Sequence, residues 1–480
     1  MIGAELIAEL DRSQNLNTTP IDITGLQGDV YDYTLIAFFE SESSGTALNL
    51  TFNNDSGTNY RFYVMTGDSA TANAQALNTT TATLESYAYS YPSFLLVNIS
   101  GESGGERKIS GQLSLSSASG DTKVRVLDSY WKNTANEITS IQLSKGASIT
   151  STFHIMVYRV PKESIQGSWE YMKELSWSSE TAEKSFTGLD GDTDIQYMLQ
   201  WDGDQGMGVQ CNNDGGSNYP KQYLRNTGGT INAGNFASQV TVFTASTQST
   251  YIINAESGVD RLIYGSGSGD YGSGVDQAQT CNWWQNKPDN LTSLDLTPGA
   301  SATGTCKLYR KINPNTTSDP LPFETIKVFD VSGDYSAGDT LSGLTCDDYK
   351  MIKIEWLGSN STTTGAIIGV RFNSDTGSNY DRQYLRARGS TASAASSTVT
   401  SNSVAFNDDG TQNYGVIYIY PKSGEYRPSL MRTLGSSGTV EELWFFAQWW
   451  KNSVDEIISI TTFSSSTDSL SGQIKISVLR

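Results

Sequence analysis

The chain has 480 residues, enough for about three domains of ordinary size. Hydrophobic residues make up 37% and charged residues only 17%, which excludes a disordered chain and a helical bundle rich in Glu, Lys and Arg. The net charge of −19 argues against nucleic acid or an anionic membrane as a partner, and the single histidine, His154, excludes most imidazole chemistry. We therefore expect a β-rich, acidic, soluble protein that is not an enzyme.

The first residues contain neither a basic segment nor an apolar run long enough for a signal peptide, and no stretch approaches the roughly 18 apolar residues of a membrane span. We expect no targeting segment and no membrane partner. The four cysteines lack CxxC spacing, so a zinc site is not expected. Cys211 and Cys281 could form one bridge, but buried free thiols are the favoured interpretation.

Each third of the chain opens and closes with apolar alternation typical of β-strands. The opening segments are residues 5–10, 171–175 and 326–329, and the closing segments are 153–159, 306–310 and 473–479. A further strand is predicted at Thr34, Ile36 and Phe38, at Tyr197, Leu199 and Trp201, and at Ile352, Ile354 and Trp356. With frequent polar turns between these segments, the pattern predicts an all-β chain of antiparallel β-sandwiches of the jelly-roll type.

Four landmarks recur three times in the same order, which identifies an internal repeat. They are Gly-Leu-x-x-Asp (25–29, 188–192, 343–347), Asn-x-Asp-x-Gly-x-Asn-Tyr (53–60, 212–219, 373–380), Ser-Gly-x-x-Arg (103–107, 257–261, 423–427), and a tryptophan 27 or 28 residues after that serine. The repeat predicts three tandem β-sandwich domains, 1–160, 161–318 and 319–480. The boundaries fall near Pro161 and in the Pro/Asn/Ser-rich stretch 313–320.

The Asn/Asp loop allows two interpretations. Asp55, Asp214 and Asp375 sit among oxygen-bearing side chains and could belong to calcium sites. The loop lacks the distal glutamate of an EF-hand and is flanked by predicted strands. We therefore favour a β-hairpin turn, with side-chain bonding by the aspartate and a positive-φ glycine.

The remaining landmarks are expected to be structural. Trp131, Trp284 and Trp450 could form a sugar-stacking platform, but their constant spacing favours burial in a packed corner. Arg107, Arg261 and Arg427 are expected to bind carboxylates or carbonyls, and His154 to be an ordinary strand residue. The same structural role is expected for Asn59, Tyr60, Asn218, Tyr219, Asn379 and Tyr380.

No catalytic, cofactor-binding or metal-binding residue is expected. A glycosidase needs two carboxylates at one cleft, which 51 acidic residues do not exclude, yet the acids common to all three copies lie in turn contexts. The Gly-x-Ser-x-Gly match at 265–269 has no credible triad in a chain with one histidine.

The ordered landmarks resemble a β-sandwich module of tailed bacteriophage virion proteins. The fullest matches are residues 372–380 and 450–460, and the first copy keeps Trp131-Lys-Asn-Thr-Ala-Asn-Glu-Ile-Thr-Ser-Ile. The second copy departs most, with Pro220 after its tyrosine and Asn290-Leu in place of Glu-Ile. This departure argues against a ligand role shared by all three loops.

The resemblance implies a non-enzymatic structural component on the outer surface of the head or tail, either a head decoration or cement protein or a tail-associated one. Its partners would be capsid or tail subunits. The alternative is a receptor-binding tail fibre or tail-tip protein that contacts a host surface glycan, and a polysaccharide-degrading tailspike is a third. The repeats fill the chain and leave no coiled-coil heptads or Gly-x-y run, which favours a compact component. Triplication could also give one chain pseudo-threefold symmetry.

Overall fold

The computed structural model describes residues 4–480 except for 41–46, 69, 86–91, 101–102, 105, 117–121, 149, 163–168, 195, 217, 220, 228–229, 237–239, 243–246, 256, 259–260, 272–273, 287, 312–320, 361–365, 389, 408–411, 437–440 and 468. The described chain is all-β and antiparallel, with two single-turn helices, α1 (Gly191–Asp194) and the 3-10 turn η1 (Cys346–Asp348). The predicted multi-domain β-sandwich fold is confirmed.

Twelve strands form each third of the described chain, called here the first, second and third copy. The first copy holds β1 (Glu5–Asn15), β2 (Ile21–Thr24), β3 (Tyr31–Phe39), β4 (Leu48–Phe52), β5 (Tyr60–Asp68), β6 (Thr71–Thr79), β7 (Ala82–Glu85), β8 (Ser93–Ser100), β9 (Arg107–Ser116), β10 (Thr122–Trp131), β11 (Ser140–Lys145) and β12 (Thr150–Pro161). The second holds β13 (Trp169–Glu180), β14 (Lys184–Thr187), β15 (Gln196–Gly203), β16 (Met207–Cys211), β17 (Lys221–Thr227), β18 (Thr230–Phe236), β19 (Val240–Val242), β20 (Thr247–Asn254), β21 (Arg261–Tyr271), β22 (Gly274–Trp284), β23 (Ser293–Pro298) and β24 (Ala302–Lys311). The third holds β25 (Glu324–Asp334), β26 (Asp339–Ser342), β27 (Met351–Asn360), β28 (Ala366–Phe372), β29 (Tyr380–Arg388), β30 (Thr391–Val399), β31 (Asn402–Asn407), β32 (Gln412–Ile419), β33 (Arg427–Ser436), β34 (Glu441–Trp450), β35 (Ser459–Ser464) and β36 (Ser469–Leu479).

Every copy has one larger and one smaller sheet with the same strand order. In the first copy the orders are β1-β12-β3-β8-β9-β10-β5-β6 and β2-β11-β4-β7, and the corresponding strands repeat these orders in the other two copies. The sequence repeat is thus also a repeat of topology. The predicted boundary near Pro161 coincides with the end of β12. The stretch 313–320 and the boundary after residue 318 lie outside the described residues.

Each sandwich has its own apolar core between the two sheets. In β15 and β27 the predicted alternation points into that core, as Tyr197 and Ile354 show. The predicted strand at Thr34, Ile36 and Phe38 is present as β3, but Leu35 faces the core of the first copy whereas Ile36 and Phe38 face a second buried cluster shared with the third copy. A strand that is buried on both faces gives no clear two-residue period.

The outer edge strand of each larger sheet carries a β-bulge at the same place. The register shifts between Leu6 and Ala8 in β1, and equivalent shifts lie between Tyr171 and Lys173 and between Thr325 and Lys327. Bulges and charged side chains protect exposed edges from pairing with another sheet. In agreement with this, every strand pair among the described residues joins strands of the same copy.

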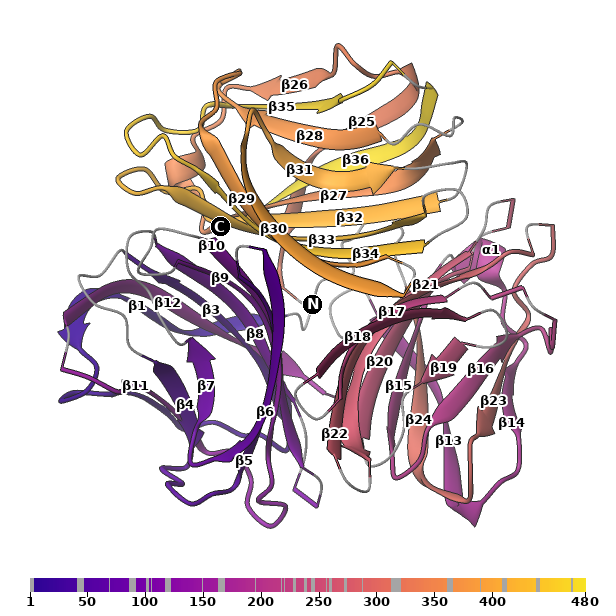
Figure 1. Cartoon of the computed structure of the whole chain (residues 1–480). Helices are drawn as coiled ribbons and strands as arrows, with labels where there is room; N and C mark the ends of the chain where they lie inside the picture. Colours follow the sequence, from indigo (N-terminus) through magenta and orange to yellow (C-terminus); the bar gives the residue numbers. More distant parts are fainter. Residues whose placement is uncertain are drawn as a thin grey trace.

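The three sandwiches form a triangle around a common centre (Figure 1). The strands next to that centre include the hairpins β5–β6, β17–β18 and β29–β30, and β6, β18 and β30 contact one another. The smaller sheets lie at the periphery. The chain therefore has a pseudo-threefold arrangement.

Candidate functional site

The repeated landmarks meet at one end of each sandwich, which is the candidate site. Trp131 ends β10, and its neighbours across the larger sheet are Arg107 of β9 and Tyr60 of β5. The row recurs as Arg261 beside Trp284 and as Arg427, Trp450 and Tyr380. The three tryptophans are fully buried, as expected from their constant spacing, and the three arginines are fully buried too.

The loop that carries the aspartate joins the two sheets. β4 belongs to the smaller sheet and β5 to the larger one, so residues 53–59 cross from one layer to the other. The predicted β-hairpin is therefore wrong, because an alternating pattern does not reveal whether two successive strands pair. The left-handed backbone is carried by Asn53 (φ 52°) and Asn54 (φ 55°) and not by Gly57. The equivalent pairs are Asn212 and Asn213, and Asn373 and Ser374.

Asp55 makes the side-chain bonds that the loop motif predicted. Its Oδ1 accepts hydrogen bonds from the Gly57 amide at 2.9 Å and from Asn59 Nδ2 at 3.1 Å, and its Oδ2 accepts one from the Trp131 indole at 2.7 Å. Burial raises the pKa of this carboxyl, but the three hydrogen bonds outweigh burial and hold the pKa below its usual range. Asp214 and Asp375 accept the indole hydrogen bonds of Trp284 and Trp450 at 2.9 and 2.8 Å.

This geometry supports the turn and not the calcium site. Both oxygens of Asp55 already accept N–H donors, and Asn59 points its amide nitrogen, which does not bind cations, at the carboxylate. Asn218 and Asn379 point their amide nitrogens in the same way. Within the described ranges, no group of three or more His, Cys, Asp or Glu could hold a metal ion.

Asn53 fastens this loop to the segment that follows the tryptophan. Its Nδ2 donates to the carbonyl of Glu137 at 2.7 Å, and its Oδ1 accepts the amides of Thr139 and Ser140 at 2.8 and 3.0 Å. Asn212 and Asn373 make the equivalent contacts. Sequence reasoning did not single out Asn53, although its recurrence at the start of all three loop motifs was the available signal.

The arginines bind backbone carbonyls of the same segment, one of the two possibilities predicted for them. Arg107 donates to the carbonyls of Asn133 and Asn136 and lies over the Trp131 ring, 5.5 Å from its centroid. Arg261 donates to Ala255, Asn286 and Asp289 and lies over Trp284, and Arg427 donates to Asp455 and lies over Trp450. Each arginine thus holds the segment that follows its tryptophan, and Arg261 also binds the loop that precedes β21.

The remaining landmarks connect loops at the same end of each sandwich. Asp29 accepts the Ser103 amide at 2.7 Å and also its hydroxyl, and these hydrogen bonds lower the pKa of the Asp29 carboxyl. Asp192 and Asp347 accept the amides of Ser257 and Ser423, both at 2.7 Å. The landmarks therefore bind one another, and the arrangement holds the loops at this end of the sandwich together.

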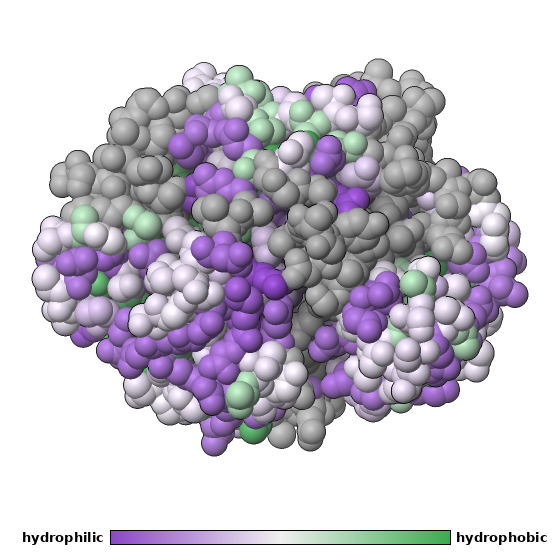
Figure 2. Space-filling view, turned by 60° about the horizontal axis from the view of Figure 1, so that its bottom comes forward, coloured by the Kyte–Doolittle hydropathy of each residue, from purple (hydrophilic) through white to green (hydrophobic). Residues whose placement is uncertain are grey.

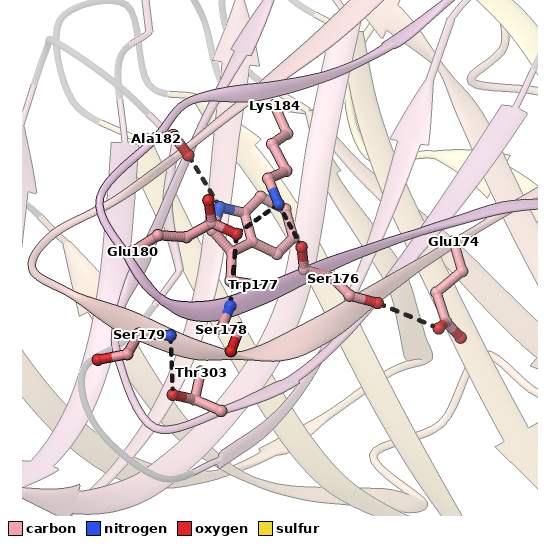
Figure 3. A network of polar contacts seen from close by, with 9 residues as sticks. All are labelled: Glu174, Ser176, Trp177, Ser178, Ser179, Glu180, Ala182, Lys184 and Thr303. Carbon is pink, nitrogen blue, oxygen red and sulfur yellow. Dashed lines mark hydrogen bonds and ion pairs between the residues drawn. The ribbon is translucent and has the colours of Figure 1, made fainter.

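A second polar network occupies the turn between β13 and β14 (Figure 3). The Trp177 indole donates to the carbonyl of Ala182 at 2.9 Å, and Lys184 pairs with Glu180 at 2.5 Å. The Lys184 ammonium also lies 5.2 Å from the centroid of the Trp177 ring. Ser179 has a left-handed backbone (φ 57°) and its amide donates to the Thr303 hydroxyl at 3.2 Å. This network stabilises a tight turn.

The centre of the molecule is a buried junction of all three copies. Met65, Leu224 and Leu385 occupy equivalent positions in its apolar cluster. The backbones approach closely, because a Cβ atom built at Gly67 would lie 2.7 Å from the carbonyl oxygen of Tyr384 in the third copy. Sequence reasoning did not predict this junction, in which Gly67 and Tyr384 approach each other from more than 300 positions apart.

The junction of the first and third copies is mainly apolar. Phe38 stacks on Tyr420 with ring centroids 4.0 Å apart. His154 lies in β12, as predicted, but its ring binds Glu9 at 3.1 Å and approaches the Tyr420 hydroxyl at 3.4 Å. The expectation of an ordinary strand residue is therefore wrong, since His154 belongs to an interface. Lys350 of the third copy completes the group by pairing with Glu9 at 2.8 Å.

The other two junctions have different chemistry. Between the second and third copies, Tyr264 stacks on Tyr414 with centroids 5.2 Å apart. Between the first and second, Asn226 donates to the carbonyl of Gln75 at 3.0 Å, and Gln277 donates to that of Val126 at 3.3 Å. Each pair of neighbouring sandwiches is thus joined by a different set of side chains.

All four cysteines are buried free thiols, as favoured from the sequence. Burial raises the pKa of the Cys346 thiol to about 12. Cys211 lies in the core of the second copy, whereas Cys281 lies in the central junction. The possible bridge between them is not formed.

No family model matches the chain, and no curated protein matches its sequence. Similar solved structures include domains LG4-5 of mouse laminin alpha1, at 9% identity and a TM-score of 0.14, covering 64% of this chain and 89% of that chain. They also include the OpdK protein of Pseudomonas aeruginosa with vanillate, at 10% identity and a TM-score of 0.11, covering 90% of this chain and 98% of that chain. Such scores carry no argument about fold or function. In the part of the chain that the structure describes, no helix is long and apolar enough to cross a membrane.

Proposed function

We propose that this chain is a non-enzymatic structural component of a tailed-phage virion, of the head-decoration or tail-associated kind. It would act on the outer surface of the particle through contacts with capsid or tail subunits. The proposal extends the sequence resemblance, and one structural observation carries it further. Three sandwiches of the same topology are joined around one centre by a buried junction, so that a single chain presents the same strand arrangement three times.

A pseudo-threefold chain is suited to a partner that is itself threefold or quasi-threefold. Closed protein assemblies present identical subunits around their symmetry axes, and a ligand with matching symmetry can make the same contact at each of them. Three linked contacts made at the same time bind more tightly than a single contact, even when each contact is unchanged. A triplicated chain achieves this valency without assembling three separate subunits.

The surface fits a role in assembly. Figure 2 shows a face whose coloured residues are mainly hydrophilic, with the hydrophobic ones scattered. The large hydrophobic side chains exposed within the described ranges are Val30, Tyr171, Val328, Val454 and Ile458. The net charge of −19 favours solubility of unassembled chains. The repeated polar landmarks form hydrogen bonds with one another, so we expect partners to bind the outer sheet faces and the other loops.

The burial of the repeated tryptophans argues against the alternative of a receptor-binding or glycan-binding protein. Stacking on a sugar requires an open aromatic face, and Trp131, Trp284 and Trp450 are fully buried. Trp283 and Trp449 are buried as well, in the central junction. The experiments that test the proposal also distinguish it from this alternative and from a tailspike enzyme.

The direct test is to purify particles of the virus that encodes the chain and to analyse them by mass spectrometry and cryo-electron microscopy. We expect the chain in a fixed copy number, with triangular density on the outside of the head or tail. Its absence from intact particles would contradict the proposal. Recombinant protein should bind no host polysaccharide on a glycan array and should release no reducing ends. Binding would favour the receptor-binding alternative, and turnover abolished by one carboxylate substitution would make the chain an enzyme.

A further inference from the structure

One ionisable side chain is buried at the junction of the first and second copies. Asp128 in β10 is fully buried, and the charged group that pairs with it is Lys108 of β9, whose Nζ lies 3.6 Å from Oδ1. Lys108 is itself only 5% exposed. A fully buried carboxylate with one cationic partner is costly to keep ionised.

Among the described residues, Lys108 and Gln277 are the side chains that act on the Asp128 carboxyl. Its partners across the sheet are Tyr63 of β5 and Ser110 of β9. From the second copy it is faced by the amide of Gln277, which also donates to the carbonyl of Val126. The apolar cluster that contains Val126, two residues before Asp128 in β10, also includes Leu443, Phe445 and Leu385 of the third copy. Lys108 is thus the charged group that determines how stable the ionised form is.

The other two copies have no ionisable pair at these positions. The register places Lys108 in line with Leu262 and Pro428, and Asp128 in line with Cys281 and Ala447. Both equivalent sites are buried and apolar. Neutral residues are therefore sufficient for this packing, and the first copy alone contains a charge.

We propose that Asp128 makes the contact between the first and second copies sensitive to pH, so that the contact is tighter under mildly acidic conditions than at neutral pH. The proposal is independent of the proposed function, since it rests only on the junction. Protonation would remove the buried negative charge and allow the neutral carboxyl to hydrogen-bond within the interface.

The direction follows from the proton affinities of the closed and open states. Burial raises the pKa of Asp128 to about 6, against the opposing effects of Lys108 and Gln277, whereas a carboxyl in water keeps a value near 3.8. The closed junction therefore binds the proton more tightly, and its stability is lost as the pH rises through about 6. From these two values, the equilibrium constant for opening should increase about tenfold between pH 5 and pH 7.

The test is hydrogen exchange measured by mass spectrometry on the full chain between pH 5 and pH 8. Peptides of β10 and β22 report the junction, and peptides of β14 and β23 in the smaller sheet of the second copy are the internal control. The matched variant is Lys108→Leu with Asp128→Ala, which takes its residues from the equivalent sites of the other copies. Comparing variant and wild type at each pH cancels the intrinsic pH dependence of exchange.

We expect the ratio of wild-type to variant opening in β10 and β22 to increase about tenfold from pH 5 to pH 7, and the ratio in β14 and β23 to stay constant. A second variant, Lys108→Gln, removes the cation that favours ionisation and should move the response to higher pH. Identical pH profiles for wild type and the double variant would overturn the proposal. So would an equal response in junction and control peptides, or an unshifted response in Lys108→Gln.

Discussion

The strongest prediction about the candidate site concerns Asp55. Replacing it with alanine removes the acceptor of three hydrogen bonds, from the Trp131 indole at 2.7 Å, the Gly57 amide at 2.9 Å and the Asn59 amide group. Trp131 is fully buried, so its N–H would be left without a partner, at a cost of about 1–3 kcal/mol. Hydrogen bonds to a charged acceptor contribute about 1.5–3 kcal/mol each, and those within one network do not add fully. We therefore expect a loss of about 3–4 kcal/mol.

Differential scanning calorimetry can measure this loss. For a folding unit of about 160 residues, 1 kcal/mol corresponds to roughly 3 °C, so Asp55→Ala should lower the Tm of its copy by about 10 °C. Asp214→Ala and Asp375→Ala serve as internal replicates, because their loops have the same bonds. Asp334→Ala is the matched control. This aspartate lies in an exposed turn and accepts the Ser336 amide at 2.8 Å, and its removal should have a much smaller effect.

Two results would refute this reasoning. A Tm for Asp55→Ala within 1 °C of the wild-type value would show that the network does not support the sandwich end. An increase in the wild-type Tm on addition of calcium, absent in Asp55→Ala, would show that the loop binds the cation after all. The Asp55→Asn variant separates charge from shape, since it keeps one acceptor oxygen and should fall between wild type and alanine.

Three further predictions concern the junction, the arginines and acid stability. Gly67→Ala should destabilise the chain by about 1–3 kcal/mol in urea unfolding, because the new Cβ would lie 2.7 Å from the Tyr384 carbonyl oxygen. The control is Gly146→Ala, whose new Cβ would have no atom within 4 Å. Equal unfolding midpoints for the two variants would contradict the close approach. Arg261→Lys should cost about 2–4 kcal/mol by the same measurement, since an ammonium cannot bind three carbonyls in a planar fork, and an unchanged midpoint would show that charge alone suffices. The loop aspartates have pKa values below the usual range, so their stabilisation is complete above about pH 4 and is lost as the pH falls through the lowered values. The urea midpoint followed by circular dichroism should therefore decrease on acidification below about pH 4, and a midpoint that does not change with pH there would contradict the assignment.

Local features of the fold followed from the sequence, and long-range ones did not. The burial of Trp131 could be predicted because a constant spacing in three copies implies a constant environment. The path of the loop at Asp55 could not, because alternation identifies strands but not the sheet to which each belongs. The side chains of β3 that face its own core could not be identified from the sequence, because Ile36 on the opposite face is buried by the third copy. The same cause hid the role of His154, whose neighbours are remote in sequence.

The pairing of the first and last strands of each copy constrains how the chain folds. β1 pairs with β12, β13 with β24 and β25 with β36, so no larger sheet is complete until the last strand of its copy has been synthesised. Each copy can then close before the next has left the ribosome, because all its strand partners lie within the same third of the chain. Successive closure keeps an early strand from meeting the similar partner strand of a later copy. Translation in order thus protects a triplicated sequence from exchanging strands between its own repeats.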